Sequence, residues 1–184
     1  MNKTLNLSVL VAIFLLFGGI AQGQKLVTTK VADNIKLKLP KNFAPMSDED
    51  KAQRYESSRL PLALFTSPDR VADFGVNRAY SVWRESDLEM LAEFYEASIM
   101  ELYDKVEFVG KGIKEVNGKK FVFFEFTSVV YPENQFQGNI AKYTYLMYAL
   151  DQGTTYIFNF SSEKNAQNRW QPVARQVMAS IRIK

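Results

Sequence analysis

The feature that most constrains the fold is a series of four apolar segments in the second half of the chain. These are residues 106–116, 121–130, 139–150 and 154–161. Asn117-Gly118 separates the first two segments and Asp151-Gln152-Gly153 separates the last two, and both are typical of hairpin turns. Because short turns join antiparallel neighbours, whereas parallel strands need a long crossover, we predict an antiparallel meander over residues 106–161.

Both faces of this predicted sheet carry apolar side chains. Successive residues of a strand point to opposite faces. In the second segment, Phe121 and Phe123 therefore point to one face, and Val122, Phe124 and Phe126 point to the other. In the third segment, Tyr143, Tyr145 and Met147 likewise oppose Leu146, Tyr148 and Leu150. A sheet with two apolar faces has to be covered on both sides.

Two amphipathic segments are predicted to form the helices that cover the sheet. Residues 87–104 have apolar side chains at helical spacing, and Ser86 with Glu89 fits a capping box at their start. A second helix is predicted to start near Trp170, with Pro172 in its first turn, and to end before an extended stretch at residues 181–184. This terminal segment contains several arginines, but a helix that lies on a membrane usually has a denser basic face. We therefore interpret it as the closing element of the core.

The first half of the chain contains shorter elements. Residues 28–31 and 35–39 are predicted to form a hairpin around Asp33-Asn34, and Ser47 is predicted to cap a short helix. Residues 62–66 and 76–83 are predicted to be strands. The fold class is therefore predicted to be α+β, with residues 24–184 forming a single domain in which an antiparallel sheet is sandwiched between helices.

The first 23 residues have the pattern of a signal peptide. Lys3 precedes an almost wholly apolar run over residues 5–20, and Ala21-Gln22-Gly23 places small residues at the cleavage positions. A retained membrane anchor is the alternative, but the apolar run is shorter than the ~20 residues that a spanning helix needs. The chain has no cysteine for lipid attachment. We predict cleavage before Gln24 and export of a soluble protein, not a lipoprotein and not membrane-inserted, to the periplasm or the extracellular space.

Composition excludes several kinds of chemistry. The sequence contains no histidine and no cysteine, so it lacks Ser/His and Cys/His nucleophile pairs and the usual zinc ligands. The net charge is +3, and removal of the leader with Lys3 lowers it by one, which offers little attraction to nucleic acid. We predict a non-enzymatic protein with no cofactor and no metal site. Carboxylate-dependent hydrolysis is the one catalytic class left open.

The order of these elements resembles the PsbP-like superfamily. The residues that carry the likeness are Ile35-x-Leu37-x-Leu39-Pro40-x-x-Phe43, Gly118-Lys119-x-Phe121, Gly153-x-x-Tyr156-x-Phe158-x-Phe160 and Ser180-Ile181-x-Ile183. That superfamily includes extrinsic photosystem proteins, a Ran-release factor of eukaryotes and bacterial envelope proteins such as DcrB. The resemblance implies an antiparallel sheet between helices and a binding or assembly role without catalysis. It transfers no functional residue.

The 87–104 segment carries a second apolar stripe, made of Met90, Phe94 and Ala97, on the side opposite its main one. The stripe could contact the 44–62 segment or consist of scattered apolar residues on the surface. Alternatively it is a surface for a partner, since clustered exposed Met and Phe favour interfaces. The leading functional hypothesis is accordingly an exported binding or assembly protein of the bacterial envelope, with an envelope protein as its partner.

Aromatic side chains of the meander suggest an alternative function. They are Tyr131, Phe136, Tyr143, Tyr145, Tyr148, Tyr156 and Phe158. Alternating aromatics in strands are typical of a core, but these could also line an apolar pocket that offers hydroxyl groups. In that case residues 131–139 would form its lid, and the protein would be a carrier or sensor of a small apolar ligand.

Glu125 is an unusual residue for a central strand, because it lies between Phe124 and Phe126. A carboxyl group on an apolar wall can serve as an acid, but hydrolysis would need a second carboxylate that the sequence does not nominate. Pairing with Lys142 on the neighbouring strand is the simpler interpretation.

Overall fold

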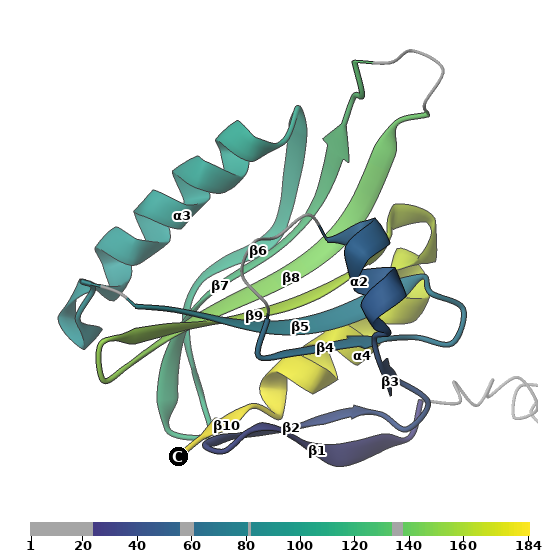
Figure 1. Cartoon of the computed structure of the whole chain (residues 1–184). Helices are drawn as coiled ribbons and strands as arrows, with labels where there is room; N and C mark the ends of the chain where they lie inside the picture. The colour runs from purple at the N-terminus through teal and green to yellow at the C-terminus, as the bar shows by residue number, and fades with distance from the viewer. Residues whose placement is uncertain (1–23, 56–60, 81, 134–137) are drawn as a thin grey trace, which may run out of the picture.

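The computed structural model describes residues 24–55, 61–80, 82–133 and 138–184, which form two antiparallel sheets and three helices (Figure 1). The strands are β1 (Leu26–Ala32), β2 (Ile35–Pro40), β3 (Ala44–Pro45), β4 (Ala63–Thr66), β5 (Ala72–Tyr80), β6 (Lys105–Val116), β7 (Lys119–Val130), β8 (Ile140–Asp151), β9 (Thr154–Glu163) and β10 (Arg182–Ile183). The helices are α2 (Asp48–Arg54), α3 (Leu88–Leu102) and α4 (Gln167–Ala179). The predicted signal peptide lies outside the described residues.

The predicted meander is confirmed as β6, β7, β8 and β9. Asn117 and Gly118 turn the chain between β6 and β7 with positive φ angles of 51° and 83°, which suit a two-residue hairpin turn. Gln152 and Gly153 do the same between β8 and β9. The sheet extends beyond the meander, because β5 pairs with β9, which gives the order β3-β4-β5-β9-β8-β7-β6.

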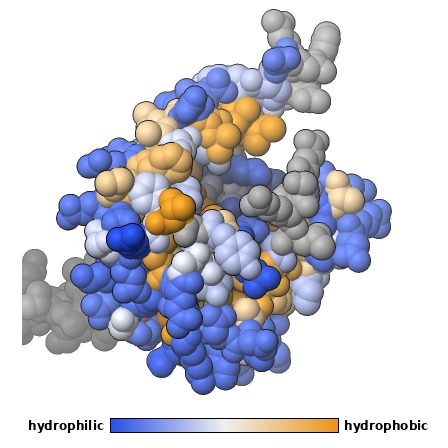
Figure 2. Space-filling model, turned by 60° about the vertical axis from the view of Figure 1, so that its left-hand side comes forward, coloured by the Kyte–Doolittle hydropathy of each residue, from blue (hydrophilic) through white to orange (hydrophobic). Residues whose placement is uncertain are grey.

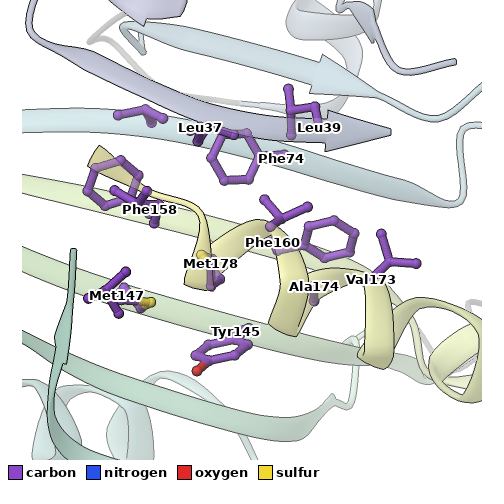
Figure 3. Packing of buried hydrophobic residues seen from close by; sticks show 14 of the residues in the cluster. Leu37, Leu39, Phe74, Tyr145, Met147, Phe158, Phe160, Val173, Ala174 and Met178 are labelled. Carbon is purple, nitrogen blue, oxygen red and sulfur yellow. The ribbon is translucent and has the colours of Figure 1, made fainter. Parts of the chain in front are cut away.

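One face of the large sheet packs against α4 and the small sheet. The small sheet has the order β1-β2-β10 and contains the predicted N-terminal hairpin. Figure 3 shows Val173, Ala174 and Met178 of α4 beside sheet residues such as Phe160. The same cluster contains Leu37 of β2, so this core is three layers deep. Both predicted covering helices therefore form, and α4 is a core element as expected.

The opposite face packs against α3 at one end and lies beside α2 at the other. Under α3 it is apolar, with Val122, Phe124 and Phe126 of β7 fully buried. Cross-strand pairing continues the row of Phe126 through Thr144 and Ser161 to Asp73 of β5, which bonds to α2. This face therefore changes from apolar under α3 to polar beside α2.

Several element boundaries differ from the predictions. A 3-10 turn at Glu85–Asp87 precedes α3, and the Asp87 carboxylate, instead of Ser86, accepts from a backbone N–H, that of Arg84, at 2.8 Å. Helix α4 begins at Gln167 after another 3-10 turn, so Pro172 lies inside it and not in its first turn. Strand β5 begins at Ala72, four residues earlier than predicted. Ser47 caps α2 as predicted, accepting from the Asp50 N–H.

No helix in the described ranges is long and apolar enough to cross a lipid bilayer.

Candidate functional site

The candidate partner surface lies on α3, whose two sides differ in exposure. Leu88, Leu91 and Ile99 are buried against the sheet. On the other side, Met90 and Phe94 are 61% and 53% exposed, and Ala97 is exposed. We call Met90, Phe94 and Ala97 the α3 patch. Figure 2 shows the side of the molecule that carries α3, with hydrophobic side chains gathered on it among hydrophilic ones.

Aromatic contacts connect the α3 patch to the core. The ring of Phe94 lies 5.8 Å from that of Trp83 and 5.3 Å from that of Tyr95. Tyr95 in turn stacks on Tyr148 of β8 at 4.0 Å. These tilted and edge-on ring contacts restrict Phe94, so it loses less conformational freedom on binding, while about half of the residue stays exposed to solvent.

The 44–62 segment, an expected contact for the α3 patch, packs beside β5 in its described part. In the described part of residues 44–62, α2 is anchored beside β5 by the ion pairs Arg54–Asp73 and Asp50–Arg70. Met90 and Phe94 are more than half exposed with α2 in place. The arrangement therefore favours the interpretation of the patch as a surface for a partner.

Helix α3 is acidic as well as amphipathic. It contains four glutamates, Glu89, Glu93, Glu96 and Glu101, and no basic residue. Glu96 is paired with Lys111 of β6. The other three are exposed: helical spacing places Glu101 in line with the α3 patch, one turn beyond Ala97, and Glu89 and Glu93 along one side of it. An apolar stripe bordered by unneutralised carboxylates is complementary to an apolar surface bordered by lysine or arginine.

The seven aromatics of the predicted pocket are divided among different environments. Tyr143, Tyr145 and Phe158 are buried in the core beneath α4, and Tyr156 packs against the same core. Tyr148 is buried on the opposite face, beneath α3. Tyr131 is 54% exposed, and Phe136 lies outside the described residues, as do the other residues of 134–137 in the predicted lid. The described members therefore do not converge on one cavity.

Glu125 is buried, but its partner is not Lys142. Its carboxylate accepts from the Arg175 guanidinium at 3.0 and 3.1 Å, from the Gln171 amide at 2.7 Å and from the Tyr143 hydroxyl at 3.0 Å. Lys142 pairs with Ser128 and Glu163 across the sheet and points to the α3 side, whereas Glu125 points to α4. The expectation failed because Lys142 is opposite Ser128, on the other face of the sheet. The charged partner of Glu125 is Arg175 of α4, 50 residues away in the sequence.

The surroundings of Glu125 are those of a structural ion pair. The hydrogen bond from Arg175 to Glu125 raises the pKa of the guanidinium, so Arg175 stays charged. The groups that bond to Glu125 in the described structure are a hydroxyl, an amide and a guanidinium, and none is the second carboxylate that hydrolysis would require. Across the described ranges there is also no group of three or more carboxylates suited to a metal ion.

Alkaline pH is expected to destabilise the protein through its buried tyrosines. Burial, and next the charge of Glu125, raises the pKa of Tyr145 from 10.0 to about 12. Burial likewise raises the pKa values of Tyr143 and Tyr148. The unfolded chain therefore releases these protons first, so the contribution of these tyrosines to stability is constant well below pH 10 and falls above it. The shift of Tyr145 corresponds to about 3 kcal/mol of lost stability, at 1.4 kcal/mol for each pKa unit, and about 2 kcal/mol of this is lost between pH 10 and pH 12.

Urea unfolding at a series of pH values would measure this loss. In Tyr145→Phe, the free energy of unfolding should decline less steeply above pH 10, because one of the titrating tyrosines has been removed. An identical decline in the variant and the wild type would contradict the assignment to Tyr145.

Sequence comparison finds no relative for this chain: no family model matches it, and no curated protein does. Solved structures do match it. The PsbP of the cyanobacterium Synechocystis sp. PCC 6803 (CyanoP) superposes with a TM-score of 0.61 at 11% identity, over 91% of this chain and 96% of that one. The Ran-binding protein Mog1p of Saccharomyces cerevisiae gives 0.58 at 9% identity, over 87% and 96%.

A third match is LpqN of Mycobacterium tuberculosis, which is described as involved in cell envelope biogenesis. It superposes with a TM-score of 0.55 at 11% identity, over 87% of this chain and 91% of that one. The chain therefore has the PsbP-like fold that its motifs predicted, and the matched structures span nearly the whole of it.

Proposed function

We propose that this chain with a PsbP-like fold is an exported, non-enzymatic binding or assembly protein of the bacterial envelope, which engages a protein partner through the α3 patch. The observation that carries the proposal is the exposure of Met90 and Phe94 on a helix whose opposite side is fully packed. Large apolar side chains that are clustered and solvent-facing mark interaction surfaces, because covering them releases water from apolar area.

Charge defines the kind of partner. The three unpaired glutamates beside the patch favour a partner segment in which apolar side chains are flanked by lysine or arginine. Such a segment would bury Phe94 at the centre of the contact and place its basic residues at the rim, where they set orientation and the rate of association.

Three lines support the remainder of the proposal. The leader pattern supports export. The absence of histidine and cysteine, and the engagement of Glu125 by Arg175, support a role without catalysis. Among proteins of the same fold, Mog1p is described as Ran-binding and LpqN as involved in envelope biogenesis, which makes protein binding and an envelope role reasonable for this chain. The division of the meander tyrosines between two faces gives no support to the small-ligand alternative.

The test is site-specific photocrosslinking from position 97, the exposed alanine of the α3 patch. The protein is expressed with its leader in a bacterial host, where we expect a periplasmic form that begins at Gln24. Crosslinked peptides should map to one partner segment that combines apolar residues with lysine or arginine. Phe94→Asp should reduce the yield at least about tenfold, since an anchor residue in the centre of an interface typically contributes 2 kcal/mol or more, about thirtyfold in affinity.

Ile140→Asp is the matched control, because Ile140 is also about half exposed but belongs to β8. It should leave the crosslink unchanged. If Phe94→Asp and the wild type, both folded, gave the same crosslinking yield, the proposed partner surface would be wrong. An acidic partner segment would refute the charge argument alone.

A further inference from the structure

A small polar cavity lies on the α3-side face of the sheet, at the end beside α2. Its volume is about 80 Å³, and its lining includes Tyr55, Leu64, Asp73, Gly75, Asn159 and Ser161. Cross-strand pairing brings the sheet residues together, because Asp73 is opposite Ser161 and Gly75 is opposite both Leu64 and Asn159. The cavity is thus formed where this face of the sheet is polar, away from the aromatic side chains that pack beneath α3.

The cavity contains two hydrogen-bond acceptors that no described residue satisfies. Asp73 is 6% exposed, and its Oδ2 atom accepts from the Arg54 guanidinium and from the Tyr55 hydroxyl at 3.2 Å. Its Oδ1 atom is buried without a partner in the described structure, and so is the side-chain oxygen of Asn159. Buried polar atoms are nearly always paired, so two unmet acceptors in one cavity indicate a missing donor-bearing group.

Gly75 keeps this space open. It lies inside β5 between β4 and β9, where glycine weakens a strand, and its backbone is not in the left-handed region that would require glycine. A Cβ atom added there would come within 3.1 Å of Leu64 Cδ1. A side chain at this position would therefore crowd Leu64 in the wall of the cavity, whereas the conformation of the strand does not require glycine.

The charges around the cavity favour a neutral ligand. Arg54 already neutralises the Asp73 carboxylate, so a ligand cation would be repelled by the guanidinium and an anion by the carboxylate. A metal ion would find one carboxylate, already paired. Hydroxyl groups suit the site, because each donates to an unmet oxygen and accepts from a neighbour such as Ser161.

From this arrangement we propose that the cavity binds two adjacent hydroxyl groups at one edge of a sugar or similar polyol. At about 30 Å³ for each water molecule, the cavity holds two or three waters, which matches a diol edge in volume. Leu64 and Tyr55 supply the apolar wall that the C–H groups of such a ligand require. The site is separate from the α3 patch, so the inference goes beyond the proposed function and does not depend on it.

The test is a titration of the mature chain, residues 24–184, followed by two-dimensional amide NMR. The probes are glucose, myo-inositol and glycerol, with methylammonium as a cationic comparison. We expect saturable shifts from at least one of the three polyols, centred on β5 and β9 near Gly75 and Asn159. Gly75→Val should fill the cavity and weaken binding at least about tenfold.

Gly110→Val is the matched control, because Gly110 is a strand glycine of β6, outside the lining, with a backbone φ that is not left-handed. It should leave binding unchanged. Asn159→Ala, which removes one acceptor without filling the space, should also weaken binding and serves if Gly75→Val does not fold. The inference fails if none of the polyols gives saturable shifts (waters alone then occupy the cavity), if only methylammonium binds, or if binding survives both lining variants.

Discussion

Deletion of residues 170–184 is expected to abolish cooperative unfolding of the protein. The deleted segment contributes six residues to the main core: Trp170, Val173, Ala174, Val177, Met178 and Ile181, each less than 9% exposed. Its removal would uncover the aromatic face of the sheet and take away β10, which pairs with β2. Burial of apolar surface is the main stabilising contribution in a domain of this size, and net stability is only about 5–15 kcal/mol.

A point substitution tests the same core with a measurable free energy. Trp170 is fully buried, and its ring lies 5.4 Å from that of Phe43 and 6.1 Å from that of Phe160. Trp170→Ala should lower the free energy of unfolding by about 3–5 kcal/mol, through lost burial and the cavity that remains. Asn168→Ala, at an exposed position two residues away in the same helix, should have little effect.

Urea and thermal unfolding measure both changes. A deletion variant that still melts in one cooperative transition would show that α4 is an appendage. In that case the terminal helix would be interpreted as a basic functional segment and not as part of the core.

Arg175→Met is expected to be the second most damaging substitution that we predict. It leaves the Glu125 carboxylate buried, with the Gln171 amide and the Tyr143 hydroxyl as the remaining donors, both to its Oε1 atom. Loss of one partner of a buried ion pair typically costs 3–5 kcal/mol, because the other charge is left uncompensated. We expect about 3 kcal/mol, the lower end, since those two donors persist and Arg175 is about half exposed.

A double-mutant cycle separates the ion pair from simple packing. Glu125→Met combined with Arg175→Met should recover most of the lost stability, because an apolar pair of similar volume carries no desolvation penalty. Lys30→Met removes a fully solvated pair, Lys30–Asp33, and should have no measurable effect. A double variant as unstable as the sum of its parts would mean that Glu125 and Arg175 act independently.

Both proposed sites depend on one property of the sheet, which is the uneven polarity of its α3-side face. Beneath α3, aromatic side chains of the sheet, such as Tyr148, pack against the helix and fix its position. The opposite side of the helix can therefore present apolar groups to solvent. Beside α2, the same cross-strand rows end in Asp73, Gly75 and Asn159, which leave a cavity instead of a core. An α3 variant and a cavity variant should therefore affect their own site without affecting the other.

Local sequence was sufficient to predict turns, helix starts and helix faces, because these depend on residues that are close together in the chain. Asn117-Gly118 predicted its hairpin because few residue pairs adopt two positive φ angles at low cost. Ser47 predicted the start of α2 because its hydroxyl reaches the N–H of a residue three positions on. The stripe at Met90, Phe94 and Ala97 also followed from helical spacing alone, as did the core side of α4.

Tertiary structure decided the features that depend on which distant residues meet. Glu125 pairs with Arg175 of a helix 50 positions away, whereas the expected pairing across neighbouring strands had favoured Lys142. The alternation of Asp73, Gly75 and Asn77 was visible in the sequence, but β5 was predicted to start only at Val76, so its polar side was not considered. Hydrogen-bonding and turn preferences act over a few residues and leave a mark in local sequence. Pairing between strands and helices far apart follows from the register of the sheet and the packing of its layers, which a single sequence does not reveal.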